Sequence, residues 1–122
     1  VAHLAGGGHP PGFQHHADGA VEQLDGGGRL LGITANSPIH RQSFDLHPGD
    51  SVVLYTDGIT EARHPGDGRQ FDESGVLDVL TRLSPDADAD AIAAAVADAA
   101  YTYADHHAAD DSGVVVVRIL EP

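Results

Sequence analysis

The sequence predicts an α+β domain in which a largely antiparallel sheet carries two helices packed on it. Three observations support this fold class. The first half of the chain has short segments of alternating apolar and polar residues between turn signals. Two segments with apolar residues at helical spacing follow one another over residues 72–83 and 84–107. A continuous apolar run over residues 113–120 closes the series of elements.

The length and composition indicate one domain and exclude several classes of function. A chain of 122 residues with 41% hydrophobic residues is long enough for one core and too short for two ordinary domains. It has no cysteine, which excludes a disulfide or a thiolate zinc site. A formal net charge of -13 disfavours both nucleic acid and an anionic membrane as partners. With no apolar run of membrane-spanning length, we expect a cytoplasmic protein.

The first strands are expected to be short and joined by turns. Residues 1–8 predict a strand, and the GGGHPPG segment at residues 6–12 predicts a loop, because proline lacks a backbone N–H and glycine weakens a strand. Asp-Gly and Pro-Gly pairs mark turns between the segments that follow. Those segments, each expected to be a short strand, are residues 13–16, 21–24, 29–33 and 43–46.

Two runs without alternation are expected to be central, neighbouring strands. Val52–Thr56 and Val114–Ile119 are both almost wholly apolar. Such runs are typical of strands that are buried on both faces of a sheet. We therefore expect the two strands to lie side by side and to bring the carboxylates at their ends together.

Two helices are expected, over residues 72–83 and about 85–106. Asp72 is a candidate N-cap for the first helix. Ser84 is the candidate cap of the second, with Pro85 at the first helical position and an acidic first turn that suits the helix dipole. The residues of the second helix that we expect to face the sheet are Ile92, Val96 and Tyr103.

The strongest candidates for chemistry are acidic residues at the ends of the two apolar strands. Asp57 follows the first strand, and Asp110 with Asp111 precedes the second. Carboxylates that converge at one rim can hold Mg²⁺ or Mn²⁺, which prefer oxygen ligands. From the residues alone, two plainer interpretations stay open: Asp57 as an ordinary turn residue, and the acidic pair as a solvated turn after a helix.

Two other groups of residues suggest metal sites less well. The acidic repeat over residues 86–90 resembles the start of a calcium loop, but Ala91 stands where that loop needs glycine and Ala97 where it needs glutamate. The favourable interaction of these acidic side chains with the positive end of the helix dipole explains the repeat better. The nine histidines include the adjacent pairs His15-His16 and His106-His107, which lack the spacing of a helical zinc site, so solvated side chains are expected.

Four motifs together resemble one protein family. The segment LHPGDSVVLYTDGITEAR, residues 46–63, closely resembles a segment of SpoIIE-type members of the metal-dependent serine/threonine protein phosphatases (PPM, type 2C). GGGHPP, GGRLLGI and DDSGVVVVRI resemble three further stretches of the same family. The four stretches occur in the family's order and with similar spacing across nearly the whole chain.

The resemblance implies an αββα sandwich with two metal ions, Mn²⁺ or Mg²⁺, at one end of its sheets. A metal-bridging water there attacks the phosphorus of a phosphoserine or phosphothreonine. Asp57 and Asp110 match metal-ligating aspartates of the family, and Asp111 occupies the partner position of the last pair. No catalytic residue beyond the metal ligands is implied. The residues expected to support the site are Gly58 at the tight turn, Thr60 and Glu61 as braces, and His9 in the GHPP stretch.

The resemblance further implies a protein phosphatase of bacterial signalling. SpoIIE-type enzymes commonly act on anti-sigma-factor antagonists with STAS domains, so a phosphorylated partner of that kind is expected, in sigma-factor regulation. The alternative is a non-catalytic interaction or regulatory domain derived from the same fold. A calcium-binding acidic module is a third class, which the missing loop residues disfavour.

The chain departs from the family pattern in ways that bear on activity. The family's earlier Asp-rich motif and its Asp-x-Ser-Gly-His-Gly motif are not among these residues, so 1–122 are expected to form a single domain, the C-terminal portion of the family domain. Half of the metal ligands would then be missing, and the isolated chain is expected to be inactive. We also expect a homo-oligomer, because edge strands and an apolar face would be exposed. Asp72 stands where the family usually has glycine.

Overall fold

The computed structural model describes residues 1–6, 9–24, 40–107 and 111–121. The expected strand over residues 29–33 and the expected metal ligand Asp110 lie outside the described residues. The strands in the described part are β1 (Ala2–Gly6), β2 (Phe13–His15), β3 (Val21–Gln23), β4 (His40–Phe44), β5 (Ser51–Tyr55) and β6 (Val114–Arg118). The helices there are α1 (Asp57–Thr60), α2 (Asp72–Arg82) and α3 (Ala89–Tyr103).

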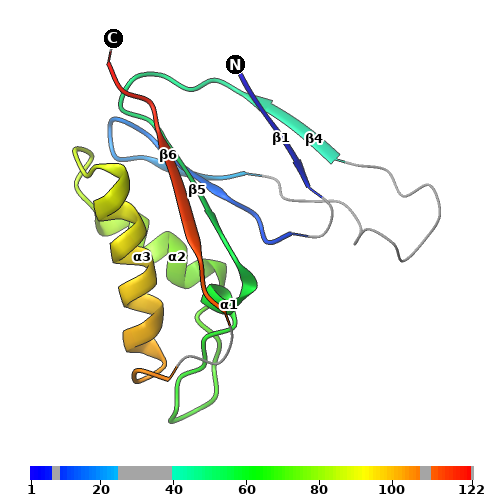
Figure 1. The fold of residues 1–122 in the computed structure, drawn as a ribbon, viewed down its shortest axis with the longest axis vertical. Helices are drawn as coiled ribbons and strands as arrows, with labels where there is room; N and C mark the ends of the chain where they lie inside the picture. Colours follow the sequence, from blue (N-terminus) through cyan, green and yellow to red (C-terminus); the bar gives the residue numbers. More distant parts are fainter. Residues whose placement is uncertain (7–8, 25–39, 108–110, 122) are drawn as a thin grey trace, which may run out of the picture.

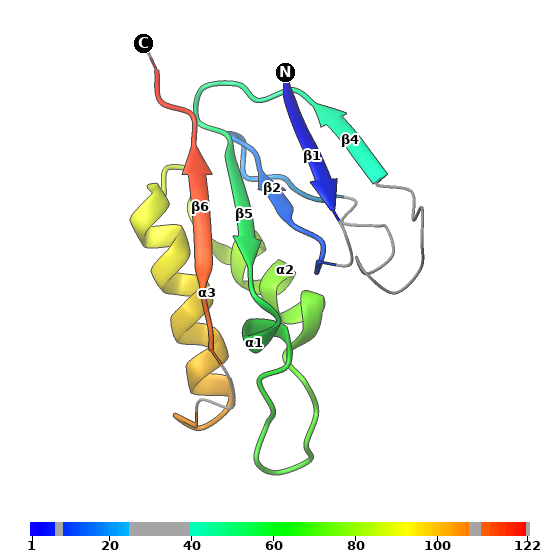
Figure 2. The same ribbon diagram turned by 45° about the vertical axis from the view of Figure 1, so that its right-hand side comes forward.

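The described strands form two antiparallel sheets. One has four strands in the order β3-β2-β5-β6, and the other pairs β1 with β4. The predicted pairing of the two apolar runs is confirmed, since β5 and β6 lie side by side (Figure 2). Ser51 is opposite Arg118, and Tyr55 is opposite Val114. Helices α2 and α3 lie together on one side of the four-stranded sheet (Figure 1), which confirms the α+β class.

The core fills the space between that sheet and the two helices. Side chains of alternate positions on β2 and β5 meet the apolar faces of α2 and α3. At the centre of those faces, Val76 and Leu80 of α2 and Ile92 and Val96 of α3 are fully buried. Removing this much apolar surface from water is the main stabilising contribution to such a fold. The central members of the core are Phe13, Val53, Tyr55, Ile59, Val76, Leu80, Ile92 and Val96. Among the described residues, no helix combines the length and apolarity that crossing a bilayer requires.

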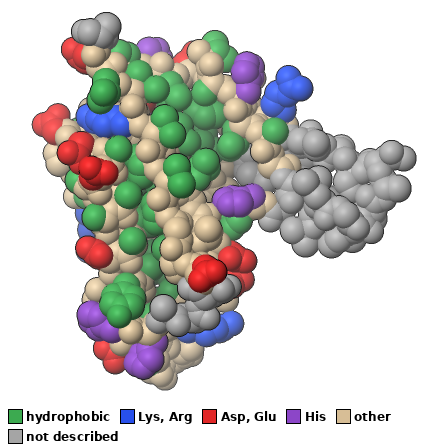
Figure 3. Space-filling view, in the orientation of Figure 1, with side chains coloured by type: hydrophobic (Ala, Val, Ile, Leu, Met, Phe, Trp, Pro, Cys, Tyr) green, Lys and Arg blue, Asp and Glu red, His purple; other side chains and the backbone are tan. Residues whose placement is uncertain are grey.

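The two central runs differ in burial, which corrects one expectation. Strand β5 is buried on both faces, as predicted, but β6 alternates. Val115 and Val117 on β6 are 60% and 52% exposed. The reason is that only one face of β6 is covered: Val114 and Val116 pack against the core, whereas the other face is exposed in the part of the chain that the structure describes. Hydrophobic side chains gather over β5 and β6 on the face seen in Figure 3.

Helix α2 begins at the expected residue but without the predicted cap, and α3 begins later than predicted. Asp72 is not an N-cap: it is the first residue of α2, has a φ of 59°, and no side chain caps this helix. That left-handed backbone suits glycine best and is tolerated by aspartate. The other helix begins at Ala89 instead of Pro85, because the Asp88 side chain accepts the Ala91 N–H at 2.8 Å. Residues 84–87 form a turn before it.

Helix α3 faces the core largely as expected. Ile92 and Val96 are fully buried. The half-buried ring of Tyr103, near the end of the helix, lies 5.4 Å from the ring of Phe71 and 5.5 Å from that of His64. Tyr103 therefore packs on the segment that precedes α2 as well as bordering the core.

Candidate metal centre at the ends of β5 and β6

Thr56 joins the two strand ends that carry the predicted metal ligands. Its backbone N–H donates to the Gly113 carbonyl at 2.9 Å, and its hydroxyl accepts the Gly113 N–H at 2.9 Å. The same hydroxyl donates to the Asp111 carbonyl oxygen at 3.3 Å. Asp57 is the next residue after Thr56, so these bonds fix Asp57 beside the segment that contains Asp111.

Gly58 allows the two segments to approach more closely than any other residue would. A Cβ atom placed on Gly58 would lie 2.2 Å from the Asp111 carbonyl oxygen and 3.0 Å from the Ser112 hydroxyl oxygen. Any side chain would therefore push the segments apart. The glycine of the Thr-Asp-Gly motif has a steric role in this site, which differs from the turn-forming role that its local sequence suggests.

Asp57 is held by the short helix that it begins. Its backbone carbonyl accepts the Glu61 N–H at 2.8 Å and the Thr60 hydroxyl at 3.2 Å. Thr60 is buried, whereas Asp57 and Glu61 are exposed. The backbone of Asp57 is thus fixed from within the fold, while the residue itself lies at the surface.

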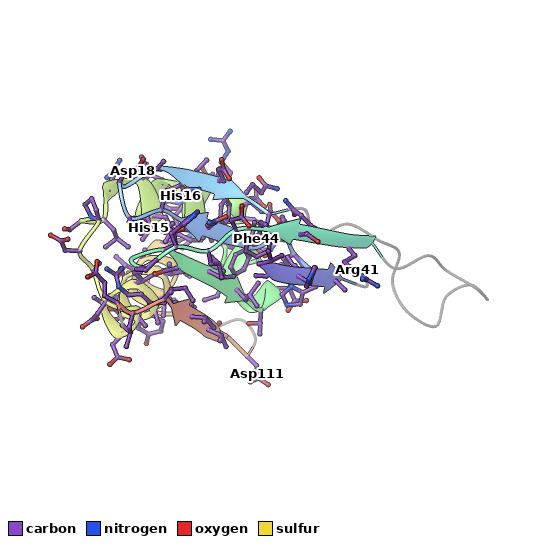
Figure 4. The ribbon with its side chains drawn as sticks, turned by 90° about the horizontal axis from the view of Figure 1, so that it is seen from above. His15, His16, Asp18, Arg41, Phe44 and Asp111 are labelled. Atoms are coloured by element: carbon purple, nitrogen blue, oxygen red, sulfur yellow. The ribbon has the colours of Figure 1, made fainter. Side chains whose placement is uncertain are left out.

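The other predicted site residues are less completely defined. Asp110 is outside the described residues, and Asp111 is exposed at the end of the molecule where β6 begins (Figure 4). His9 is exposed and donates from its ring to the Pro10 carbonyl at 2.8 Å. It borders an apolar groove of about 460 Å³ whose wall includes Thr56. Within the described ranges, no three His, Asp or Glu side chains come together as a metal site.

The donor atoms that the described part offers suit a hard divalent cation. Asp57 and Asp111 supply carboxylates from adjacent segments, and Mg²⁺ or Mn²⁺ prefers oxygen ligands of this kind while retaining several waters. Gly58 and Thr56 keep those segments in contact. The two carboxylates are donors of the kind that such a cation takes, but within the described residues they do not make a complete metal site.

Tyr55 makes a contact with the GHPP loop that sequence reasoning missed. Its hydroxyl donates to the Pro11 carbonyl, which ties the GHPP loop to the central strand. Its ring stacks near Phe13, with centroids 6.3 Å apart. Burial, and secondarily the charge of Glu73, raises the pKa of Tyr55 well above its usual range, so it remains a neutral donor. The available signal was a tyrosine in an otherwise aliphatic strand.

A model of one known protein family matches almost the whole chain. The family model of stage II sporulation protein E (SpoIIE) matches residues 1–120. The chain belongs to the SpoIIE family. Two curated relatives match about half of it: the phosphoserine phosphatase RsbU of Bacillus subtilis, 37% identical over 60 residues, and the protein IcfG of Synechocystis, 36% identical over 58 residues. The matched segments cover 48% of this chain in each case, but only 18% of RsbU and 9% of IcfG.

Solved structures match the SpoIIE-family chain over almost its whole length. The phosphatase domain of SpoIIE from Bacillus subtilis, presoaked with Mn, has a TM-score of 0.76 and 21% identity, covering 98% of this chain and 51% of that one. The SiaA-PP2C domain of Pseudomonas aeruginosa has a TM-score of 0.72 and 20% identity, covering 98% and 46%. At these identities the likeness establishes a PP2C-type fold. The chain spans about half the length of these solved domains.

Proposed function

We propose that this chain is part of a metal-dependent protein phosphatase that acts on phosphoserine or phosphothreonine. The observation that carries the proposal is the placement of Asp57, exposed at the end of the central strand and held against the Asp111 segment through Thr56 and Gly58. The family match over residues 1–120 and the named activity of RsbU support it.

In the proposed mechanism Asp57, Asp110 and Asp111 hold Mn²⁺ or Mg²⁺. When bound, such an ion lowers the pKa of a coordinated water and neutralises phosphate charge. The contribution of the protein is positional. Thr60 and Glu61 hold the backbone of Asp57 through α1, and Gly58 keeps the second segment within reach. We assign no further catalytic residue.

The proposed substrate is a phosphorylated bacterial signalling protein. We infer a STAS-type anti-sigma-factor antagonist in the cytoplasm, because the relatives include RsbU and a mycobacterial chain with RsbU and RsbW domains. The latter has a TM-score of 0.62 and 20% identity, and covers 98% of this chain and 34% of that one. Purified phospho-STAS proteins can be compared as substrates, and equal turnover of unrelated phosphoproteins would contradict this assignment.

The decisive experiment removes one carboxylate from the proposed site. In the protein that contains residues 1–122, Asp57→Asn should lower Mn²⁺-dependent turnover of p-nitrophenyl phosphate and of a phosphoserine peptide by more than about a hundredfold, the upper end of what changes outside the ligand shell cost. The control Asp45→Asn removes another exposed carboxylate, after β4, and should have no effect. Equal turnover by both variants would refute the assignment of Asp57.

We further propose that residues 1–122 alone hydrolyse phosphate esters poorly. A two-metal site needs ions roughly 3.5–4 Å apart, and the three carboxylates assigned above can hold at most one ion well. Weak Mn²⁺ binding is compatible with this, because such ions tolerate many water ligands. Robust metal-dependent turnover by these residues alone, retained in Asp57→Asn, would show that the wrong residues carry the chemistry.

A non-catalytic interaction domain is the second candidate, favoured by the exposed face of β6. Val115 and Val117 project from an edge strand, and edge strands with apolar side chains promote pairing between copies. We propose that residues 1–122 form a homo-oligomer through this face. Val115→Thr with Val117→Thr should shift the chain toward monomer in sedimentation experiments, and a stable wild-type monomer at micromolar concentration would contradict the proposal.

A further inference from the structure

A groove of about 980 Å³ lies between the loop over residues 61–71, helix α2 and helix α3. Its wall combines apolar and aromatic side chains with arginines. The chain has only 6 Lys and Arg residues against 19 Asp and Glu, yet three of those six line this one groove. The arginines are Arg63, Arg69 and Arg82, and the apolar and aromatic side chains are Phe71, Val79, Leu83 and Tyr103.

The loop is held so that two of these arginines border the same groove. Arg63 and Gln70 form an antiparallel bridge, and the His64 N–H donates to the Arg69 carbonyl at 2.9 Å. The Arg63 guanidinium donates to the Gly68 carbonyl at 3.0 Å, which fixes the tip of the loop. The Tyr103 hydroxyl donates to the Gln70 carbonyl at 3.4 Å, so α3 secures the loop from the other side.

The three guanidinium groups differ in how far their charge is balanced. Arg82 Nε lies 3.3 Å from the Asp78 carboxylate on the same helix, at the exposed surface. Arg63 is partly engaged by the Gly68 carbonyl, and Arg69 is exposed with no side-chain hydrogen bond or ion pair within the described residues. Asp72 and Asp78 also line the groove and oppose an anion, and the Asp67 carboxylate accepts the Arg69 backbone N–H at 3.0 Å. Arg69, with Arg63 beside it, is therefore the main cationic feature of the groove.

We propose that this groove docks an acidic, extended segment of the phosphoprotein substrate, close in sequence to the phosphorylated residue. Guanidinium groups bind carboxylates in a forked geometry, and the apolar wall can accept one aliphatic side chain of such a segment. The chain has a net charge of -13, so most of its surface repels an acidic partner. The arginines make this groove the place where the charge of the protein is complementary to that of an acidic peptide.

The position of the groove in the chain connects it to the proposed metal centre. Arg63 follows Asp57 by six residues, so their Cα atoms lie at most roughly 22 Å apart. An extended peptide of about seven residues is long enough to span that distance. The docking role rests on the proposed phosphatase function for the identity of the ligand, whereas the binding of an acidic peptide can be measured without turnover.

The binding test uses the protein that contains residues 1–122 and a fluorescent peptide of about ten residues, rich in Asp and Glu with one central Leu. Anisotropy should show binding that weakens as salt is raised. The double variant Arg63→Gln/Arg69→Gln should weaken it about tenfold. The control Arg41→Gln removes one positive charge, where the double variant removes two. Arg41 lies on the exposed surface of β4, on the side of the molecule away from the helices (Figure 4), and the control should leave affinity unchanged.

A gain of affinity provides the complementary test. Asp72→Asn removes one of the opposing charges that line the groove, and asparagine tolerates the left-handed backbone of that position, so affinity should rise about threefold. Equal losses in Arg41→Gln and in the double variant would overturn the docking site. The docking site would also be overturned if inorganic phosphate bound to the protein while acidic and neutral peptides bound with the same affinity.

Turnover separates this inference from the proposed function. With a phosphoserine peptide that has acidic flanks, Arg63→Gln/Arg69→Gln should raise KM about tenfold with little change in kcat, and turnover of p-nitrophenyl phosphate should be unchanged. Arginine-dependent peptide binding without any phosphatase activity would refute the proposed function and retain the groove as a docking site. Unchanged KM with intact activity would refute the docking site alone.

Discussion

Strand β5 has an aspartate just before it and another two residues after it, and the two carboxylates differ in almost every physical respect. Asp50, in the Pro-Gly-Asp turn, is 3% exposed and accepts the backbone N–H groups of His47 and Ala17, each at 2.9 Å. Burial alone would raise the pKa of Asp50, but these donors and the nearby His16 and His47 outweigh it and hold that pKa below its usual value. Asp57 is exposed at the other end.

The difference indicates that the two ends of β5 have different roles, one structural and one at the surface. At the start of β5, a buried carboxylate connects the turn, β2 and the loop after it, and its hydrogen-bonding capacity is used within the fold. At the end of β5, the protein fixes the backbone of Asp57 through Thr56 and Thr60 and leaves the residue at the surface. A carboxylate with unused acceptor capacity is available for a cation, whereas a satisfied one is not.

The largest effect expected from this comparison concerns stability. Asp50→Ala leaves the His47 and Ala17 N–H groups without their acceptor, so the free energy of unfolding should fall by about 2–4 kcal/mol. Asp57→Ala should change it by less than about 0.5 kcal/mol without metal, as for other surface positions. Urea denaturation with and without Mn²⁺ measures both. The comparison fails if Asp57→Ala destabilises the metal-free chain as much as Asp50→Ala does.

A smaller effect is expected from the contact between the two strand ends. Gly58→Ala places a Cβ atom 2.2 Å from the Asp111 carbonyl oxygen, so the segments must separate. The expected cost is about 1–3 kcal/mol of stability, as for other overpacked sites. Gly113→Ala is the matched control in the same pair of segments, because its Cβ atom would lie 3.6 Å from Thr56 Cγ2. Denaturant midpoints that are equal for the two variants would rule out the close approach.

The sequence predicted what depends on apolar patterning. The pairing of β5 with β6 followed from two continuous apolar runs, and the buried face of α3 followed from the spacing of Ile92 and Val96. The start of α3 did not follow, because Ser84 and Asp88 are both good caps and it is Asp88 whose side chain accepts an N–H of the first turn, from Ala91. The exposure of Val115 and Val117 depends on what lies opposite β6, which local sequence does not encode.

The candidate site was predictable to a similar extent. Thr-Asp-Gly at a strand end and its family resemblance pointed to Asp57, but the steric role of Gly58 depends on a segment more than fifty residues away in the chain. The arginine groove was not predicted, because Arg63 and Arg69 meet Arg82 only after the loop has folded onto α2 and α3. His15 was expected to be solvated, yet it is fully buried, which corrects that expectation for one histidine of the adjacent pair.

His15 tests whether the start of β5 has the structural role inferred above. It lies opposite Ser51 across β2 and β5, beside His16 (Figure 4). Both of its ring nitrogens and the Ser51 hydroxyl are buried without a hydrogen-bond partner within the described residues. The Leu80 carbonyl is near enough to favour the protonated ring, although it does not form a hydrogen bond. The region around the start of β5, where the buried Asp50 connects the fold, thus also contains His15 and Ser51, two buried polar side chains without hydrogen-bond partners within the described residues.

The pH dependence follows from the environment of that ring. Burial, and then the charges of Arg118 and His16, lower the pKa of His15 below its usual value of 6.5. Above about pH 6.5 the ring is neutral in both the folded and the unfolded chain, so its contribution to stability is complete there. As pH falls below that value, the unfolded chain takes up a proton that the folded chain resists, and stability declines until the lowered pKa is reached.

His15→Leu should therefore raise the free energy of unfolding by about 1 kcal/mol at neutral pH, because an unpaired buried polar group is replaced by an apolar one of similar size. The gain should grow between about pH 7 and pH 5, since the leucine variant has no proton to exclude. Urea denaturation across that range measures it. His3→Leu, which removes an exposed imidazole from β1, should show no comparable growth. If the two variants share the same pH dependence, burial of His15 does not set the acid sensitivity of this end of the sheet.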